Sequence, residues 1–171
     1  MKKIIYIIPG QGENCNLARY KSLSSDLIKK GYVVHPVNPD WYKPISNQVF
    51  KIEKNSIIIG FSFGAVLAYL LAEKYSCKKL ILASPSPIHT FKESDFVDSL
   101  KPYMSKANAL EIFKDLKKIK INLHTLKSPY VTLMGQKETM VKNETPAQIY
   151  VPRTGHYLGK TYIKYILNQI Q

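Results

Sequence analysis

Cysteine is scarce in this chain of 171 residues, with Cys15 and Cys77 as the only two. They form neither a CxxC pair nor a spacing typical of a metal site, so the sequence predicts neither a disulfide scaffold nor a structural zinc. No cofactor-binding motif accompanies them, and we expect no metal and no cofactor. Two free thiols are typical of a reducing compartment, which favours a cytoplasmic location.

Long apolar runs are also absent, since none reaches the ~20 residues that span a membrane. The longest candidate, Ile57 to Ala72, is interrupted by two glycines and a serine. Met1 to Ile8 has the charge-then-apolar order of a signal peptide, but its apolar part is too short and ends at Pro9. Buried secondary structure explains both stretches better, and no transmembrane segment is expected.

Arginine is nearly absent, because Arg19 and Arg153 are the only two among 25 lysine and arginine residues. Against these stand 12 aspartate and glutamate residues, which gives a net charge of +13. Such a charge suits an acidic partner, which could be nucleic acid, an anionic lipid surface or a negatively charged substrate. Sequence-specific nucleic-acid readers, however, rely on arginine for bidentate base contacts. We therefore expect no specific nucleic-acid partner. A lysine-rich solvated surface explains the charge, and weak contact with anionic surfaces stays open.

The chain alternates short β-branched runs with longer segments of helical periodicity. The β-branched runs predict six strands, at Lys3–Ile8, Tyr32–Val37, Ser56–Ile59, Lys79–Ala83, Tyr130–Met134 and Ala147–Val151. The helical segments predict a helix that Asn16 caps and Gly31 closes, and further helices over Ile45–Glu53, Gly64–Tyr75, Ala107–Ile119 and Tyr157–Gln169.

No repeat or linker divides the chain, so a single domain over 1–171 is expected, with a loop or small cap at about 85–106. Strands separated by helices predict an α/β fold, with a doubly wound, mostly parallel sheet of six strands and helices on both faces. In such sheets the functional residues follow the carboxyl ends of the strands. The candidates for catalysis in this chain do so.

A GxSxG motif, Gly60 to Gly64, stands between the strand at Ser56–Ile59 and the helix at Gly64–Tyr75. This strand–turn–helix context is the one in which GxSxG carries a nucleophilic serine. The serine occupies the apex of a strained turn, and the flanking glycines remove side chains that would collide with the strand and the helix. Ser62 is therefore the predicted nucleophile, with an incidental serine in a tight turn as the alternative.

With this motif in place, the chain resembles the α/β-hydrolase superfamily in its order of elements, from Lys3 to the final helix. It resembles a minimal member, because the first two strands of many members are missing and the cap is small. The resemblance implies that His156, after the last strand and before the last helix, is the catalytic base. His35, His89 and His124 are better explained as surface or packing residues, although His89 lies in the cap that overhangs the site.

The superfamily carries its acid in the loop after the strand that corresponds to Tyr130–Met134, three residues beyond a glycine. Glu138 occupies that place, where aspartate is more usual, and Glu144 is the alternative. Some members carry the acid one strand earlier, but Ser84-Pro85-Ser86 offers no carboxylate there. The resemblance thus implies a triad in the chain order serine, acid, histidine.

Acyl transfer needs two N–H donors where the negative oxygen develops. The resemblance implies that Phe63, directly after the nucleophile, supplies one of them, and that Gln11 in the loop Pro9–Gly12 supplies the other. Pro9 replaces a histidine that often stands in this loop. The replacement leaves the main-chain donor in place.

These residues predict a serine hydrolase that cleaves a carboxylic ester or thioester through an acyl-enzyme on Ser62. A peptidase or amidase on the same scaffold and an inactive binding protein with a hydrolase fold remain alternatives. The apolar side chains of Phe61 and Trp41, together with His89, are expected to face a small acyl substrate. The sequence identifies neither the acyl group nor the oligomeric state.

Overall fold

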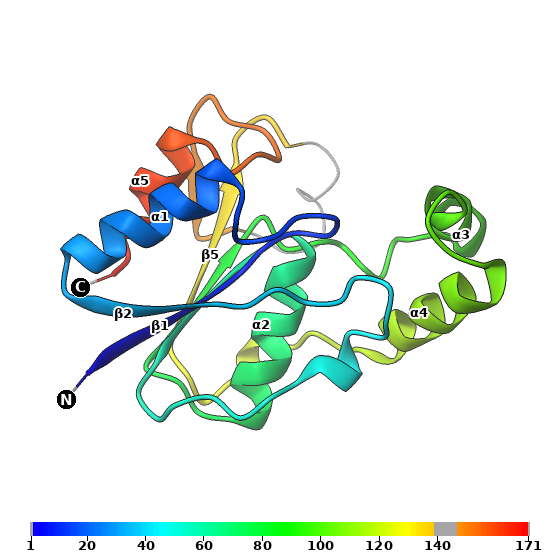
Figure 1. The fold of residues 1–171 in the computed structure, drawn as a ribbon, viewed down its shortest axis with the longest axis horizontal. Helices are drawn as coiled ribbons and strands as arrows, with labels where there is room; N and C mark the ends of the chain where they lie inside the picture. The colour runs from blue at the N-terminus through cyan, green and yellow to red at the C-terminus, as the bar shows by residue number, and fades with distance from the viewer. Residues whose placement is uncertain (1, 139–146, 171) are drawn as a thin grey trace.

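The computed structural model describes residues 2–138 and 147–170. In this part of the chain six strands form one parallel sheet in the order β2-β1-β3-β4-β5-β6 (Figure 1). The strands are β1 (Lys3–Ile8), β2 (Tyr32–Pro36), β3 (Ile57–Phe61), β4 (Lys79–Ala83), β5 (Tyr130–Gly135) and β6 (Ile149–Val151). The prediction of a six-stranded, mostly parallel sheet is confirmed.

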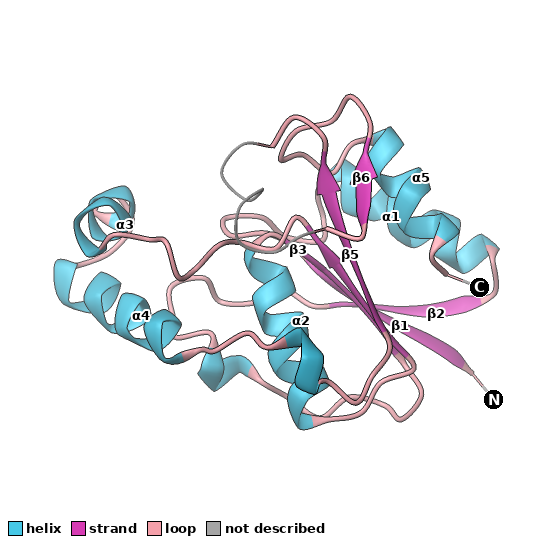
Figure 2. Cartoon of the chain, turned by 180° about the vertical axis from the view of Figure 1, so that it is seen from behind, coloured by secondary structure: helices cyan, strands magenta, loops and turns pink. Residues whose placement is uncertain are grey.

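Helices cover both faces of the sheet, as expected (Figures 1 and 2). α1 (Ala18–Lys29) and α5 (Lys160–Asn168) lie on one face, and α2 (Phe63–Lys74) lies on the other. Strand β1 contributes side chains to the hydrophobic cores on both faces of the sheet. Ile5 and Ile7 are buried with α1 and α5, whereas Tyr6 and Ile8 are buried with α2, because successive side chains of a strand point to opposite faces.

The region expected as a loop or small cap contains a helix, α3 (Glu93–Leu100), which precedes α4 (Lys106–Lys118). The two helices project beyond the sheet on the α2 side (Figure 1). α3 buries Phe96, Val97 and Leu100 against the same core as α2 and α4. Three prolines nearby and the short length of this helix hid its periodicity in the sequence.

Two helix predictions are wrong. Asn16 does not cap α1, because the Leu17 N–H bonds to the Asn14 carbonyl in a turn, and the helix begins one residue later without a side-chain cap. The helix expected over Ile45–Glu53 is reduced to one short turn at Ser46–Gln48. Gln48 instead uses its side chain to bond to the preceding loop.

The last helix begins later than expected, at Lys160 rather than Tyr157. Two tight turns precede it, in which the N–H groups of Tyr157 and Gly159 bond to the carbonyls two residues before each. The buried face of the helix agrees with the prediction, since Tyr162, Ile163 and Ile166 are all in the core. The turns shorten the helix but place His156 at the edge of the sheet where the strands end.

The winding of the sheet reverses between β1 and β3, because β1 leads outward to β2 in one direction and β3 leads to β4, β5 and β6 in the other. Loops that follow strands on the two sides of such a reversal diverge and leave a crevice. In this chain the loop after β1 and the turn after β3 border that crevice. They carry Gln11 and Ser62.

Gly64 at the start of α2 packs directly against the end of β1. A Cβ atom there would lie 2.2 Å from the Pro9 carbonyl oxygen and 2.4 Å from the Ile8 carbonyl oxygen. We expect Gly64→Ala to lower the free energy of unfolding by about 2–3 kcal/mol, because this overpacking outweighs the helix preference of alanine. Urea unfolding measures the change.

Gly155→Ala is the matched control, since a Cβ atom at Gly155 would meet no described atom within 4 Å. If both variants lost the same small amount of stability, the end of β1 would move aside at little cost, and Gly64 would not be required for the packing.

Candidate active site

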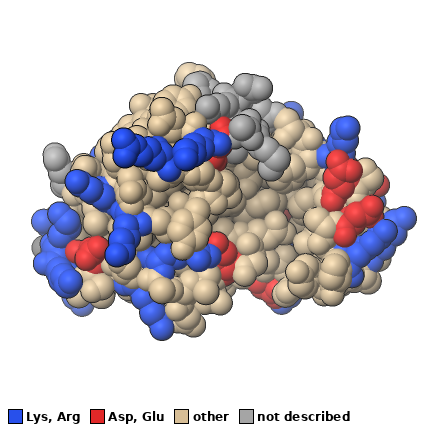
Figure 3. Space-filling view, turned by 90° about the horizontal axis from the view of Figure 1, so that it is seen from above, with Lys and Arg blue, Asp and Glu red and all other residues tan. Residues whose placement is uncertain are grey.

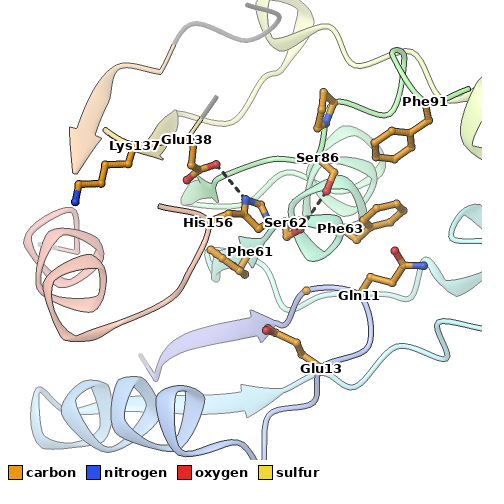
Figure 4. Close-up of a pocket in the computed structure, with 12 residues that line it drawn as sticks. Gln11, Glu13, Phe61, Ser62, Phe63, Ser86, Phe91, Lys137, Glu138 and His156 are labelled. Carbon is orange, nitrogen blue, oxygen red and sulfur yellow. Dashed lines mark hydrogen bonds and ion pairs between the residues drawn. The ribbon is translucent and has the colours of Figure 1, made fainter. Parts of the chain in front are cut away.

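Ser62 lies at the apex of the turn between β3 and α2, with φ of 55° and ψ of −121°. Such left-handed backbone is strained for a residue with a side chain, and it is typical of a nucleophile elbow. The turn requires Gly60, where a Cβ atom would lie 2.3 Å from the Gly64 carbonyl oxygen. Ser62 is buried, and its hydroxyl group faces a cavity (Figure 4).

His156 lies between the serine and a carboxylate, as Figure 4 shows. Its Nε2 atom is 2.8 Å from Ser62 Oγ, and its Nδ1 atom is 3.0 Å from Glu138 Oε2. A carboxylate only accepts hydrogen bonds, so Nδ1 carries the proton, and Nε2 accepts from the Ser62 hydroxyl. The ring packs on Phe61 at a centroid distance of 5.1 Å, which fixes its plane. His156 is thus poised to take the proton of Ser62.

Glu138 is buried, at 5% exposure, and both of its oxygens have hydrogen-bond partners. Oε2 binds His156, while Oε1 accepts from the Gly135 N–H at 2.8 Å and from the Ser84 hydroxyl at 2.5 Å. Burial alone would raise the pKa of this carboxyl group, but the bonds from His156, Ser84 and Gly135 outweigh it and lower the pKa below its ordinary value. Glu138 therefore stays ionised opposite the imidazole.

Ser84 and Tyr162 support this carboxylate, and sequence reasoning missed both. Because the Ser84 hydroxyl donates to Glu138, the Tyr162 hydroxyl must donate to Ser84, with 2.7 Å between the two oxygens. Ser84 has a φ of 47°, and its hydroxyl group lies within hydrogen-bond distance of the Glu138 carboxylate. The available signal was the place of Ser84 directly after β4, where the resemblance described above allows the acid to stand. For Tyr162 the sequence predicted only a core position in the last helix.

Ser86 is a further residue that the sequence did not single out. Its Oγ lies 3.1 Å from Ser62 Oγ, and both atoms are buried. Since the Ser62 proton points to His156, the Ser86 hydroxyl is the donor in this pair. A continuous run of hydrogen bonds therefore extends from Ser86 through Ser62 and the imidazole of His156 to Glu138.

The cavity at Ser62 has a volume of about 460 Å³. Three of the residues predicted for the site line it, namely Phe61, Phe63 and Gln11. Trp41 and His89 do not. Trp41 borders a neighbouring cavity on the far side of Gln11, and His89 borders one on the other side of Ser86 and Pro87. The alternative acid, Glu144, lies outside the described residues.

The charges of the protein are unevenly distributed (Figure 3). On this face basic side chains gather on the side of α1 and α5, whereas acidic and basic side chains lie together on the side of the cap helix α3, which carries Glu93, Asp95 and Asp98. Within residues 2–138 and 147–170, no helix has the length and apolar character needed to cross a membrane. No cluster of three possible metal ligands occurs in the same ranges.

The lowered pKa of Glu138 makes stability depend on pH. A carboxyl group with a depressed folded-state pKa contributes stability fully above its ordinary value of 4.5, and this contribution is lost as the pH falls through the folded-state pKa. We expect the free energy of unfolding to fall more steeply for the parent than for Glu138→Gln between about pH 5 and pH 3. Urea unfolding across this range measures the two slopes, and parallel slopes would contradict the expectation.

No protein-family model and no curated protein matches this sequence. Solved structures do match in fold, although none of the following exceeds 17% identity. An α/β-hydrolase enzyme from the sediment metagenome of the Mar Chica lagoon in Morocco has a TM-score of 0.66 and 17% identity, with 99% of this chain and 89% of that chain covered.

Two further matches have a TM-score of 0.63. The type II thioesterase BorB from the borrelidin biosynthetic cluster is 17% identical, with 99% of this chain and 90% of that chain covered. A monoacylglycerol lipase from Paleococcus ferrophilus is 13% identical, with 97% and 93% covered. The chain therefore has the α/β-hydrolase fold, as its resemblance to that superfamily implied.

Proposed function

We propose that this protein is a serine hydrolase that cleaves carboxylic esters or thioesters. The observation that carries the proposal is the run of hydrogen bonds from Ser62 Oγ to His156 Nε2, at 2.8 Å, and from His156 Nδ1 to Glu138, at 3.0 Å. This arrangement suits a nucleophile, its general base and the acid that orients the base.

The geometry supports the following mechanism. His156 removes the proton of Ser62 as the serine oxygen attacks the substrate carbonyl, and Glu138 stabilises the imidazolium that forms. The N–H groups of Phe63 and Gln11 stabilise the oxyanion. The imidazolium then gives its proton to the leaving alcohol or thiol, and water activated by His156 releases the acid from Ser62.

The choice of ester or thioester rests on two observations. The lining of the cavity is mixed, with the phenyl rings of Phe61, Phe63 and Phe91 beside Ser86 and His156, which suits an apolar acyl group with a polar carbonyl. The neighbours in fold include a thioesterase and a monoacylglycerol lipase.

A fluorophosphonate probe tests the proposal directly, because it phosphonylates serines that a neighbouring base activates. We expect labelling of the native protein and none after heat denaturation. A panel of p-nitrophenyl acyl esters, acyl thioesters and acyl anilides then separates the substrate classes. Faster turnover of anilides than of esters would indicate an amidase. A folded protein that takes up no probe would indicate a binding protein with a hydrolase fold.

A further inference from the structure

A second cluster of polar side chains borders the catalytic cavity on the side of the loop that follows β1 (Figure 4). It consists of Glu13, Arg19 and Tyr20, which we name the Glu13 cluster. Glu13 lines the catalytic cavity beside Gln11 (Figure 4). Its two carboxylate oxygens bind different partners, the Arg19 guanidinium group and the Tyr20 hydroxyl. None of the three has a place in the reaction described above.

The Glu13 cluster holds the loop that follows β1. Gly10 to Glu13 form a turn in which the Glu13 N–H donates to the Gly10 carbonyl at 3.0 Å, and Gly12 has a φ of 72°. Gln11 lies at the tip of this turn. Its main-chain N–H is the proposed second oxyanion donor, so the position of the turn decides where that donor points.

Tyr20 fixes the turn from α1. The Gly10 N–H donates to the Tyr20 hydroxyl at 3.1 Å, and that hydroxyl donates in turn to Glu13. These directions are unambiguous, because an amide N–H only donates and a carboxylate only accepts. Tyr20 is 1% exposed, and its burial raises the pKa of the phenol, which keeps the proton on the hydroxyl group. One hydroxyl therefore ties both ends of the turn to the core.

The turn also touches the nucleophile. A methyl group on Gly10 would lie 3.2 Å from Ser62 Cβ and 3.3 Å from Glu13 Oε2, so no space remains between the loop, the nucleophile and the carboxylate. A displacement of the turn would move the Gln11 donor relative to Ser62. The indole N–H of Trp41 donates to the Glu13 carbonyl at 3.0 Å and limits that displacement further.

The charge of Glu13 needs compensation at this place. A carboxylate close to a developing oxyanion raises the barrier, because like charges repel strongly in a site of low dielectric constant. Arg19 supplies the compensating charge. Its guanidinium group lies 5.6 Å from the Tyr20 ring centroid and 5.3 Å from the Tyr157 ring centroid, which holds it beside Glu13.

We propose that Tyr20 and Arg19 are positioning residues for the oxyanion loop, Tyr20 by fixing Gly10 and Glu13 and Arg19 by neutralising Glu13. This inference rests on the proposed hydrolase function. The Glu13 cluster would then affect kcat through the position of the loop, without a hydrogen bond to His156.

Tyr20→Phe tests the positioning role. We expect kcat for the fastest p-nitrophenyl ester of the panel to fall about 10- to 100-fold, with KM changed less than about twofold, because oxyanion donors act mainly in the transition state. The pH profile of kcat should keep its shape, since the base is untouched.

Tyr69→Phe is the matched control. Tyr69 is as buried as Tyr20, and its hydroxyl likewise accepts from a main-chain N–H, that of Asn122 at 3.0 Å, and bonds to a carboxylate, that of Glu73 at 3.1 Å. It lies in α2, outside the catalytic cavity. We expect comparable losses of stability in the two variants, but a loss of kcat in Tyr20→Phe alone. Equal kcat values in the two variants would overturn the proposal.

Charge neutralisation has its own test. We expect Arg19→Gln to lower kcat about tenfold, because it leaves the Glu13 carboxylate uncompensated near the oxyanion. The double variant, which carries Arg19→Gln and Glu13→Gln, should recover most of that loss, because it contains no such carboxylate. A double variant no faster than Arg19→Gln would overturn this role of Arg19. A native protein that neither takes up the probe nor hydrolyses any substrate would overturn the proposed function as well, so the two failures are distinguishable.

Discussion

Ser62→Ala is expected to abolish labelling by the fluorophosphonate probe and to lower kcat on the preferred ester by about a million-fold. The variant removes the atom that forms the covalent bond, while the remaining groups of the site stay in place. Because the serine hydroxyl makes only two hydrogen bonds among the described residues, with His156 and Ser86, the fold should tolerate its loss. Circular dichroism checks the fold, and mass spectrometry of the labelled parent locates the adduct.

Ser128→Ala is the control for the labelling experiment. Ser128 is buried as well, but its hydroxyl oxygen accepts the Cys77 N–H at 2.9 Å, and within the described residues it makes no hydrogen bond to a histidine. This variant should label at the parental rate. An adduct on any serine other than Ser62, or persistent labelling of Ser62→Ala, would remove Ser62 from the proposed mechanism.

Glu138→Gln is expected to lower kcat by about 10⁴-fold, although the side chain keeps its size. The reason lies in the surroundings of Oε1, which accepts two hydrogen bonds, from Gly135 and Ser84. The amide oxygen of a glutamine will take that place, so its NH₂ group will face His156 Nδ1. The imidazole is then forced into the tautomer with the proton on Nε2, which cannot accept the proton of Ser62.

Nitrogen NMR of the imidazole distinguishes the two tautomers in the parent and in Glu138→Gln. Glu144→Gln serves as the control and also tests the alternative acid, because Glu144 is the other carboxylate that the sequence offers in this segment. We expect Glu144→Gln to keep the parental kcat. A large loss in Glu144→Gln together with a small loss in Glu138→Gln would exchange the roles of the two residues.

The sheet and the elbow were predictable because local sequence determines them. A β-branched run with no polar interruption, such as Ile57–Ile59, is buried on both faces of a parallel sheet. Glycines on both sides of a serine, between a strand and a helix, permit the tight turn in which a side chain at either place would collide. Local signals of this kind, together with the resemblance to a known superfamily, also predicted His156 and Glu138 as the base and the acid.

The supporting residues were not predictable, because their partners lie far away in the sequence. Ser84 bonds to a carboxylate 54 residues later and to a tyrosine 78 residues later. Nothing in the neighbourhood of Ser84 indicates either partner. Similarly, the cap helix α3 is defined by packing of Phe96 against Phe63 and Phe91 rather than by its own periodicity.

The distance in sequence between Ser62 and His156, 94 residues, has a consequence for folding. The proposed nucleophile follows the third strand, but the proposed base follows the sixth, and Tyr162 of the last helix holds the proposed acid through Ser84. No partly folded chain that lacks the docked C-terminal segment can have an activated serine, since long-range contacts form late. Uptake of a serine-directed probe during refolding would therefore mark the completion of the native sheet, later than the return of helical circular dichroism.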